Sequence, residues 1–245
     1  MTVAAVLVAA GSGTRLGRTL PKALVTLAGE PLAGHAARGL AAGRSATGER
    51  IEQLVVTAPA GHLDEVRDAV AGALVGLDLP VVVVAGGASR QASVAAALAA
   101  LDERADVVLV HDAARPLVPG SLVGRVIDAV RAGHAAVVPG LAVTDTIKRV
   151  PQGTGPALPV LETVPRDELR AVQTPQGFER ELLDRAHAAA AEHAHDESLA
   201  ASDDARLVEL AGEQVWVVAG DERAAKITTE RDLAVAELLL GEERG

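Results

Sequence analysis

The stretch that decides the fold is TVAAVLVAAGSGTRLGRTLPKALV, residues 2–25. It begins with an apolar run over residues 2–9, as expected for a strand that is buried on both faces of a parallel sheet. Three glycines, two arginines and one lysine follow this run. Such an ending is typical of a phosphate-binding loop, but a plain surface turn is the alternative, and the rest of the sequence must decide between them.

The alternation of apolar runs and helical patterns predicts the fold class. Further strand-like runs lie at residues 53–58, 80–85, 106–110 and 135–139. Between them, Ala- and Leu-rich segments with helical spacing lie at 32–43, 61–75, 89–101 and 120–132. Strands that alternate with helices predict an α/β protein with a Rossmann-like, mostly parallel sheet. Ser121 is expected to cap the last of these four helices.

The pattern changes after Pro139. Residues 141–175 hold five prolines and short strand-like pieces, and we interpret about 141–173 as a projecting β-arm within a single domain of residues 1–245. A lone hairpin cannot bury both of its faces on itself, so we expect a partner subunit to cover the arm and the protein to form a homodimer. Helical patterns return at residues 178–194, 203–211 and 229–240, with a short strand at 214–218.

The composition excludes several classes of protein. A formal net charge of −10 disfavours non-specific nucleic-acid binding, which relies on Lys and Arg against phosphates. The absence of Cys excludes disulfides, thiolate catalysis and Cys-based zinc sites. The N-terminus reads as a strand rather than a signal peptide, and no apolar run reaches the roughly 20 residues of a membrane span. We therefore expect a cytoplasmic protein that binds neither nucleic acid nor membrane.

The glycine loop differs from two familiar phosphate-binding loops. Its third glycine, Gly17, comes one residue too late for the dinucleotide fingerprint G-x-G-x-x-G, and Pro21 interrupts the helix that should follow. The P-loop pattern fails because Arg18, rather than Lys, follows Gly17. An NAD site and a P-loop are therefore both disfavoured.

The residues that remain in this loop still suit a triphosphate. Gly11 and Gly13 expose backbone amides that phosphate oxygens can approach closely. Arg15 adds a planar guanidinium and Lys22 a point charge, which together can bind several oxygens. We expect a phosphate-binding loop here.

Five segments, taken in order, resemble one enzyme family. They are AAGSGTR with PK at residues 9–22, GGASRQASV at 86–94, VHDAARP at 110–116, TPQ at 174–176 and KIT at 226–228. This set resembles the 2-C-methyl-D-erythritol 4-phosphate cytidylyltransferases of the non-mevalonate isoprenoid pathway, and the resemblance covers essentially the whole chain. It implies a sheet of the nucleotide-diphospho-sugar transferase type.

The resemblance also implies a reaction, the transfer of CMP from CTP to 2-C-methyl-D-erythritol 4-phosphate with release of pyrophosphate. The acceptor phosphate is itself the nucleophile, so catalysis depends on positioning and charge stabilisation. The catalytic residues implied are Arg15 and Lys22, which hold the triphosphate, and Lys226, which joins Lys22 around the α-phosphate.

Binding roles are implied by the same resemblance. The CTP contacts would come from Ala9, Ala10, Gly11, Gly13, Gly87 and Ser93. The acceptor contacts would come from Asp112, Arg115, Thr146, Arg166 and Thr174. Of these, Thr146 and Arg166 lie on the arm and would reach the site of the other subunit. Asp112 would also lie near a Mg²⁺ ion, which needs only one or two carboxylates beside phosphate oxygens.

Some alternatives stay open. The acceptor could be another polyol phosphate, such as ribitol 5-phosphate, or the chain could be a non-catalytic nucleotide-binding module. Asp112 could simply cap the following helix. A metal site at His187, His193 and His195 is disfavoured because their spacing does not place them on one helical face. We expect a solvent-exposed helix end there.

Overall fold

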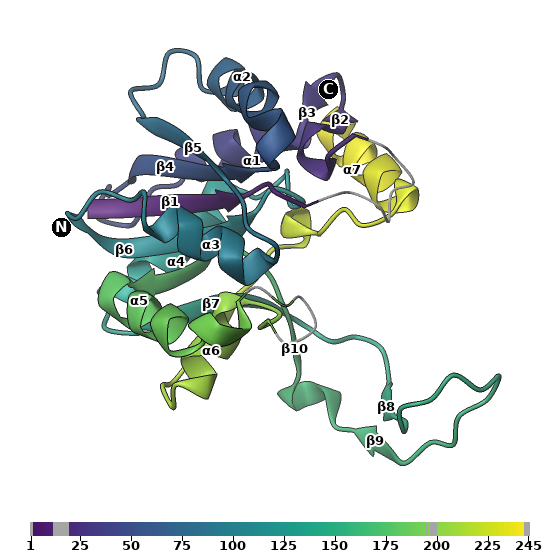
Figure 1. Ribbon diagram of the computed structural model, residues 1–245. Helices are drawn as coiled ribbons and strands as arrows, with labels where there is room; N and C mark the ends of the chain where they lie inside the picture. Colours follow the sequence, from purple (N-terminus) through teal and green to yellow (C-terminus); the bar gives the residue numbers. More distant parts are fainter. Residues whose placement is uncertain (1, 12–19, 195, 197–199, 243–245) are drawn as a thin grey trace.

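A computed structural model describes residues 2–11, 20–194, 196 and 200–242. In this part of the chain, an eight-stranded sheet lies at the centre, in the order β10-β7-β11-β6-β1-β4-β5, with β12 also paired to β7 (Figure 1). The strands are β1 (Thr2–Val8), β4 (Ile51–Ala58), β5 (Val81–Ala85), β6 (Ala105–Asp112), β7 (Ala136–Ala142), β10 (Arg170–Val172), β11 (Gln176–Glu179) and β12 (Trp216–Ala219).

Most of these strands point the same way. β1 pairs in parallel with both β4 and β6. β4 also pairs in parallel with β5, and β7 with β12. β11 lies antiparallel between β6 and β7, and β10 is antiparallel to β7. The prediction of a mostly parallel α/β sheet is confirmed.

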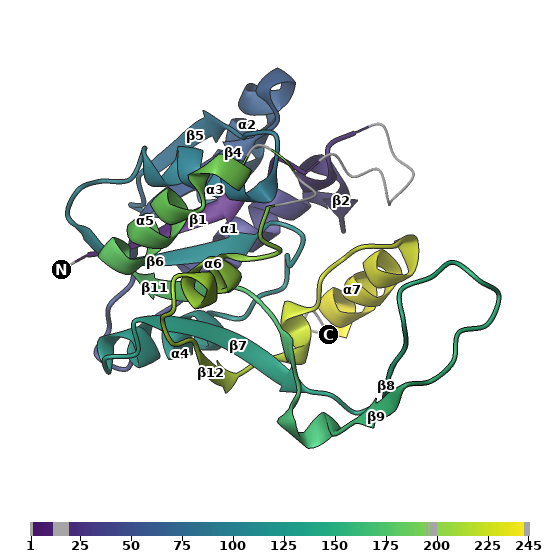
Figure 2. The ribbon, with the colours of Figure 1, turned by 60° about the horizontal axis from the view of Figure 1, so that its bottom comes forward.

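Helices cover both faces of the sheet (Figures 1 and 2). On β1, Val3, Ala5 and Leu7 face one helical layer, while Ala4 and Val6 face the other. Alternate side chains of a strand point to opposite faces, and here both faces are buried, so the strand is apolar throughout. The first layer contains α1 (Leu32–Ala41), α2 (Leu63–Ala73) and α4 (Gly120–Arg131), and the second α3 (Arg90–Leu98), α5 (Arg180–Ala189) and α6 (Asp204–Leu210).

The last helix, α7 (Glu230–Glu242), forms a smaller core with the hairpin of β2 (Thr26–Leu27) and β3 (Glu30–Pro31). Its start is fixed by a reciprocal cap. Thr229 Oγ1 accepts from the Asp232 N–H at 3.2 Å, and Asp232 Oδ2 accepts from the Thr229 N–H at 2.8 Å. Among the described helices, α7 included, none is long and apolar enough to cross a membrane.

A two-stranded ribbon, β8 (Ile147–Arg149) and β9 (Glu162–Val164), projects away from the sheet (Figures 1 and 2). From β9 the chain returns through a short 3-10 helix, η4 (Arg166–Glu168), to β10 at the sheet edge. The loop at the tip exposes Val160 and Leu161, with 57% and 60% of their surfaces accessible. The predicted projecting hairpin is present, with apolar side chains in solvent.

Two local predictions are wrong. The helix expected from residue 178 begins at Arg180, because Gln176–Glu179 forms β11. Phe178 is fully buried there, between Val108 of β6 and Ala136 of β7, whose backbone groups need strand partners. Ser121 does not cap α4, since Pro119 holds the N-cap position and Ser121 lies in the first turn.

The edge strand β12 carries the single Trp of the sequence. Trp216 is 42% exposed and packs against the His134 ring, with ring centroids 4.2 Å apart. The largest aromatic group of the protein therefore lies at the sheet edge and not in its core.

Candidate active site

The candidate site lies at the carboxyl ends of β1 and β6. From β1 the chain moves outward to β4 and β5 and then returns to β6, on the other side of β1. Such a reversal of strand order is where open α/β sheets bind ligands. Asp112 ends β6 and lies beside Val8, near the end of β1. The glycine loop and the HDAARP segment therefore leave the sheet from neighbouring strands.

The Asp112 carboxylate binds two cations. Lys226 Nζ donates to Oδ2 at 2.6 Å, and Arg90 Nε donates to Oδ1 at 3.2 Å. Burial acts to raise the pKa of Asp112, but Arg90 and Lys226 outweigh it and hold the pKa well below the ordinary 3.8. Asp112 is therefore an anion at neutral pH, in direct contact with the predicted catalytic lysine.

Arg90 connects this pair to a second buried carboxylate. Its Nη1 donates to Asp204 Oδ2 at 2.6 Å, and His187 Nε2 lies 2.9 Å from Asp204 Oδ1. Asp204 is fully buried and His187 only 7% exposed, so the expectation of a solvent-exposed helix end is wrong for His187. The reason is that α5 packs against α6, which begins with Asp204.

A hydroxyl and an imidazole fix the backbone around Asp112. Thr174 Oγ1 accepts from the Asp112 N–H at 3.1 Å and lies 2.9 Å from His111 Nδ1. His111 Nε2 lies 3.1 Å from the Arg115 carbonyl oxygen, which can only accept, so Nε2 carries the proton. Burial lowers the pKa of His111 to about 4. The imidazole is thus neutral, and the Thr174 hydroxyl donates to its bare Nδ1.

The Arg115 side chain holds two neighbouring segments. Its Nη1 donates to the Ala224 carbonyl at 2.6 Å and its Nη2 to the Val172 carbonyl at 3.2 Å. These bonds join the end of β6 to the segment before Lys226 and to the end of β10. Both terminal nitrogens therefore serve the protein backbone, and a contact between Arg115 and a substrate stays a prediction.

The residues predicted to contact the cytosine base lie at the ends of β1 and β5. Ser93 Oγ donates to the Ser89 carbonyl at 2.8 Å and accepts from the Gly87 N–H at 3.1 Å. Ala9 is buried, and its N–H donates to the Thr57 carbonyl at 3.0 Å. The Ser93 hydroxyl thus orders the loop that carries Gly87.

Gly86 allows the two predicted base-binding segments to meet. A Cβ atom on Gly86 would lie 2.3 Å from the Ala10 Cβ and 2.9 Å from Ser93 Oγ. No side chain fits at this position, so the end of β1 and the loop after β5 are in contact. Ala10 and Ser93 are thereby brought together, as a shared base pocket requires.

Both ends of the glycine loop are in place. The Lys22 N–H donates to the Gly11 carbonyl at 3.4 Å, and Lys22 begins a short 3-10 helix, η2 (Lys22–Leu24). The predicted triphosphate residues Gly13 and Arg15 lie outside the described residues. Gly11 and Lys22 are thus held together at the base of the loop.

The two predicted arm residues are separate from this group. Thr146 is exposed just before β8, and Arg166 is exposed at the start of η4, where it donates to the Thr144 carbonyl. The arm that carries them points away from the sheet (Figures 1 and 2). In the described part of a single chain, the hydrogen bond of Arg166 stays within the arm.

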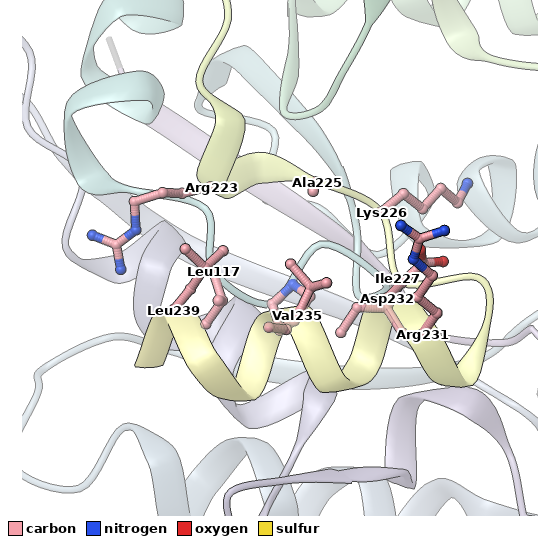
Figure 3. Close-up of a pocket in the computed structure, with 11 residues that line it drawn as sticks. Leu117, Arg223, Ala225, Lys226, Ile227, Arg231, Asp232, Val235 and Leu239 are labelled. Atoms are coloured by element: carbon pink, nitrogen blue, oxygen red, sulfur yellow. The ribbon is translucent and has the colours of Figure 1, made fainter. Parts of the chain in front are cut away.

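A pocket of about 110 Å³ lies beside Lys226 and along α7, from Arg231 to Leu239 (Figure 3). Arg223 lies at one end of it, and Lys226 and Arg231 lie at the other. Its lining is mainly apolar and includes Leu117 and Val235. Lys226 therefore borders both Asp112 and an accessible space.

The contacts of Asp112 allow a test of the predicted Mg²⁺ site. Mg²⁺ binds oxygen atoms, usually one or two carboxylates together with phosphates and waters. Both oxygens of Asp112 already accept from Arg90 and Lys226. The described residues also contain no group of three or more His, Cys, Asp or Glu suited to a metal. The site, in this arrangement, does not fit a metal ion held by Asp112.

Known proteins match the chain over nearly its whole length. The family model for 2-C-methyl-D-erythritol 4-phosphate cytidylyltransferase (IspD) matches residues 3–242. The chain belongs to this family. A cytidylyltransferase of that name from Streptomyces avermitilis is 46% identical over 98% of this chain and 92% of its own length. A crystal structure of the cytidylyltransferase from Thermus thermophilus has a TM-score of 0.74 and 37% identity, and 98% of each chain is covered.

One relative in this family is considerably longer. The bifunctional enzyme IspD/IspF of Clavibacter michiganensis is 51% identical over 98% of this chain, which spans 55% of that relative's length. The match thus concerns roughly half of the bifunctional protein.

Family membership confirms the resemblance that the five segments indicate, and with it the class of enzyme, a cytidylyltransferase. The sequence reasoning missed Arg90, Asp204 and His187. The sequence holds a signal for two of them. Arg90 lies inside one of the five segments, and Asp204 follows Asp203 at the start of a predicted helix, where one of two adjacent acids can be buried only with a cationic partner.

Proposed function

We propose that the protein transfers the cytidylyl group of CTP to 2-C-methyl-D-erythritol 4-phosphate, with release of pyrophosphate. An oxygen of the acceptor phosphate forms a bond to the α-phosphorus. The bond from the α-phosphorus to the bridging oxygen breaks, and its electron pair leaves with pyrophosphate. The observation that carries the proposal is the ion pair between Lys226 and Asp112, which lies where the strand order of the sheet reverses, in a chain that belongs to this family.

The proposed catalysis consists of positioning and charge stabilisation. Lys22, Lys226 and Arg15 would bind phosphate oxygens whose negative charge is redistributed in the transition state. Asp112 holds Lys226 Nζ at 2.6 Å, which fixes the ammonium group near the carboxyl end of β6. A fixed cation needs little reorganisation when the charge shifts, and this lowers the barrier.

We propose the remaining contacts on the same basis. Ala9, Ala10, Gly11, Gly13, Gly87 and Ser93 would surround the CTP, and Asp112, Arg115 and Thr174 would lie around the acceptor. We propose a divalent cation that is bound by the phosphates of CTP and not by Asp112. Chelation with EDTA followed by addition of Mg²⁺ tests it, because restored turnover would support a metal carried by the nucleotide.

We also propose that the arm forms a homodimer and brings Thr146 and Arg166 to the partner's site. The exposed side chains of Val160 and Leu161 in the arm support this, because their burial against a partner subunit would stabilise the dimer. In sedimentation velocity, Leu161→Asp should shift the protein from dimer to monomer. Leu210→Asp, which alters an equally exposed leucine on α6, is the matched control. A wild-type monomer at micromolar concentration would contradict the proposal.

A cytoplasmic location remains a proposal as well, and the cysteine-free sequence supports it because such chains need no oxidising compartment.

The test of the main proposal is pyrophosphate release from CTP with either 2-C-methyl-D-erythritol 4-phosphate or ribitol 5-phosphate as acceptor. Turnover with the first and not the second supports it, and the reverse result would identify another polyol phosphate as the acceptor. Lys226→Ala should lower kcat about 100- to 1000-fold, by analogy with the loss of an oxyanion-hole donor. Arg104→Gln, an exposed cation just before β6, should not. No turnover with either acceptor would indicate a binding module.

A further inference from the structure

We propose that Arg90 is a positioning residue of the transfer reaction. It fixes the Asp112 carboxylate, and through it the Lys226 ammonium group, and it joins this pair to the loop predicted to bind the cytosine base. The inference rests on the proposed function, because it assigns a role in that reaction to a side chain that acts through the carboxylates it holds.

The first step of the argument is the place of Arg90 in the chain. It is the first residue of α3, directly after Ser89, whose Oγ caps the helix by accepting from the Ala92 N–H at 3.0 Å. The same turn contains Ser93, whose hydroxyl holds the Gly87 N–H. The guanidinium is thus anchored to the segment predicted to contact the base.

The second step is the pair of anions that Arg90 joins. Its Nε donates to Asp112 and its Nη1 to Asp204, at 3.2 Å and 2.6 Å. Burial acts to lower the pKa of Arg90, but Asp204 and Asp112 outweigh it, and the pKa lies above the ordinary value. A planar guanidinium holds two carboxylates at a fixed angle, whereas the rotatable ammonium group of lysine sets no such angle.

The third step concerns what holds Arg90 from behind. Asp204 is fully buried, and its second oxygen contacts His187 Nε2 at 2.9 Å. The anion is therefore fixed between α5 and α6 and cannot follow Arg90 if it moves. A rigid support of this kind is what keeps catalytic groups in their productive geometry.

The consequence appears when a phosphate arrives. Lys226 must then share its ammonium group between Asp112 and phosphate oxygens. Because Arg90 retains the other oxygen of Asp112, the carboxylate stays in place while Lys226 turns. Without Arg90, Asp112 would be free to follow Lys226 or to contact the phosphate itself, which would bring two anions together.

The experiment compares Arg90→Gln with a matched control, Arg131→Gln. Arg131 also bridges two carboxylates, Glu49 at 3.0 Å and Asp106 at 2.6 Å, and its side chain has the same 21% exposure. It lies near Ala105, at the opposite end of β6 from the site. The carboxylates that Arg131 bridges are more exposed than Asp112 and Asp204, at 32% and 38% against 11% and 0%, so the two kcat values are compared per folded molecule. A difference that remains then reports on the site.

The expected result is a kcat about 100-fold lower for Arg90→Gln, as misplacement of a reacting group by about 1 Å can produce. Arg131→Gln should keep kcat within about 3-fold of the wild type, because distant sites act nearly independently. Circular dichroism gives the folded fraction used to normalise both values. Arg90→Lys keeps the charge but loses the fixed angle between the donors of arginine, so it should restore stability more than kcat.

The pH profile gives a readout that a purely structural role would not move. The charged and titratable groups around Asp112 are Arg90 from α3, Lys226 before α7, and Arg115 and His111 from the end of β6. Removal of Arg90 takes away a cation that lowers the pKa of Asp112. The acidic limb of kcat should therefore move to higher pH in Arg90→Gln and stay unchanged in Arg131→Gln.

The outcomes separate this inference from the proposed function. If the wild type does not turn over CTP with either acceptor, the proposed function fails. If the wild type is active and Arg90→Gln keeps both kcat and the acidic limb, the inference alone is overturned. Equal losses of kcat in Arg90→Gln and Arg131→Gln also overturn it. If Arg90→Gln does not fold, Arg90→Lys decides, and wild-type kcat in that variant overturns the inference.

Discussion

Replacement of Thr174 by Val removes one hydroxyl and changes the shape of the side chain very little. Thr174 is only 5% exposed, and its Oγ1 serves two buried groups, the Asp112 N–H at 3.1 Å and His111 Nδ1 at 2.9 Å. The added methyl group takes the place of the hydroxyl, so water has little room to replace it. Both partners lose their hydrogen bond at once.

The size of the effect follows from these two contacts. A buried donor or acceptor left without a partner costs about 1–3 kcal/mol. Two such groups predict a loss of about 2–6 kcal/mol in the free energy of unfolding. Thr174→Ser keeps the hydroxyl and loses one methyl group, which predicts a loss of about 1 kcal/mol. The serine variant should therefore be clearly more stable than the valine variant.

The assay is urea unfolding of the three proteins at neutral pH, followed by far-UV circular dichroism. The transition midpoints should fall in the order wild type, Thr174→Ser, Thr174→Val, with unchanged slopes. Activity of the folded valine variant should also fall, since the Asp112 backbone loses its support. A valine variant as stable as the serine variant would refute the assignment of both hydrogen bonds.

Three further predictions concern other parts of the molecule. Burial lowers the pKa of His111 from the ordinary 6.5 to about 4, so as the pH falls the unfolded chain binds this proton before the folded protein does. The free energy of unfolding should therefore fall by about 3 kcal/mol between pH 6.5 and pH 4. His111→Asn should show a shallower pH slope in urea unfolding, and an unchanged slope would contradict the prediction. Asp232→Ala removes the cap of α7 and should cost about 1 kcal/mol, whereas a loss below a few tenths would argue against the cap. Gly86→Ala forces a Cβ against Ala10 and should cost about 1–3 kcal/mol and raise the KM for CTP, and an unchanged KM would place the base elsewhere.

The elements that the sequence predicts well are those whose pattern follows from local burial. β1 is apolar because both of its faces are covered, and this pattern places the strand to within a residue. β11 was missed because its strand character comes from β6 and β7, which flank it in space. A four-residue segment next to a helix carries too little periodicity to reveal such neighbours.

The site shows the same division. Asp112 and Lys226 could be proposed from motifs, although they are 114 residues apart and no spacing indicates their contact. The contacts behind Asp112 could not be predicted from the sequence, because Arg90, Asp204 and His187 come from three different helices. Only the packing of α5 and α6 against α3 turns these side chains into one chain of charges.

The place of Trp216 determines what fluorescence can report about this protein. With one Trp and no Tyr, the intrinsic emission comes almost entirely from a side chain on β12, stacked against His134. An emission change in urea would record the opening of the sheet edge, and nucleotide binding at the far ends of β1 and β6 would leave it nearly silent. A Trp introduced on the arm, away from this background, would instead give a direct optical signal of subunit association.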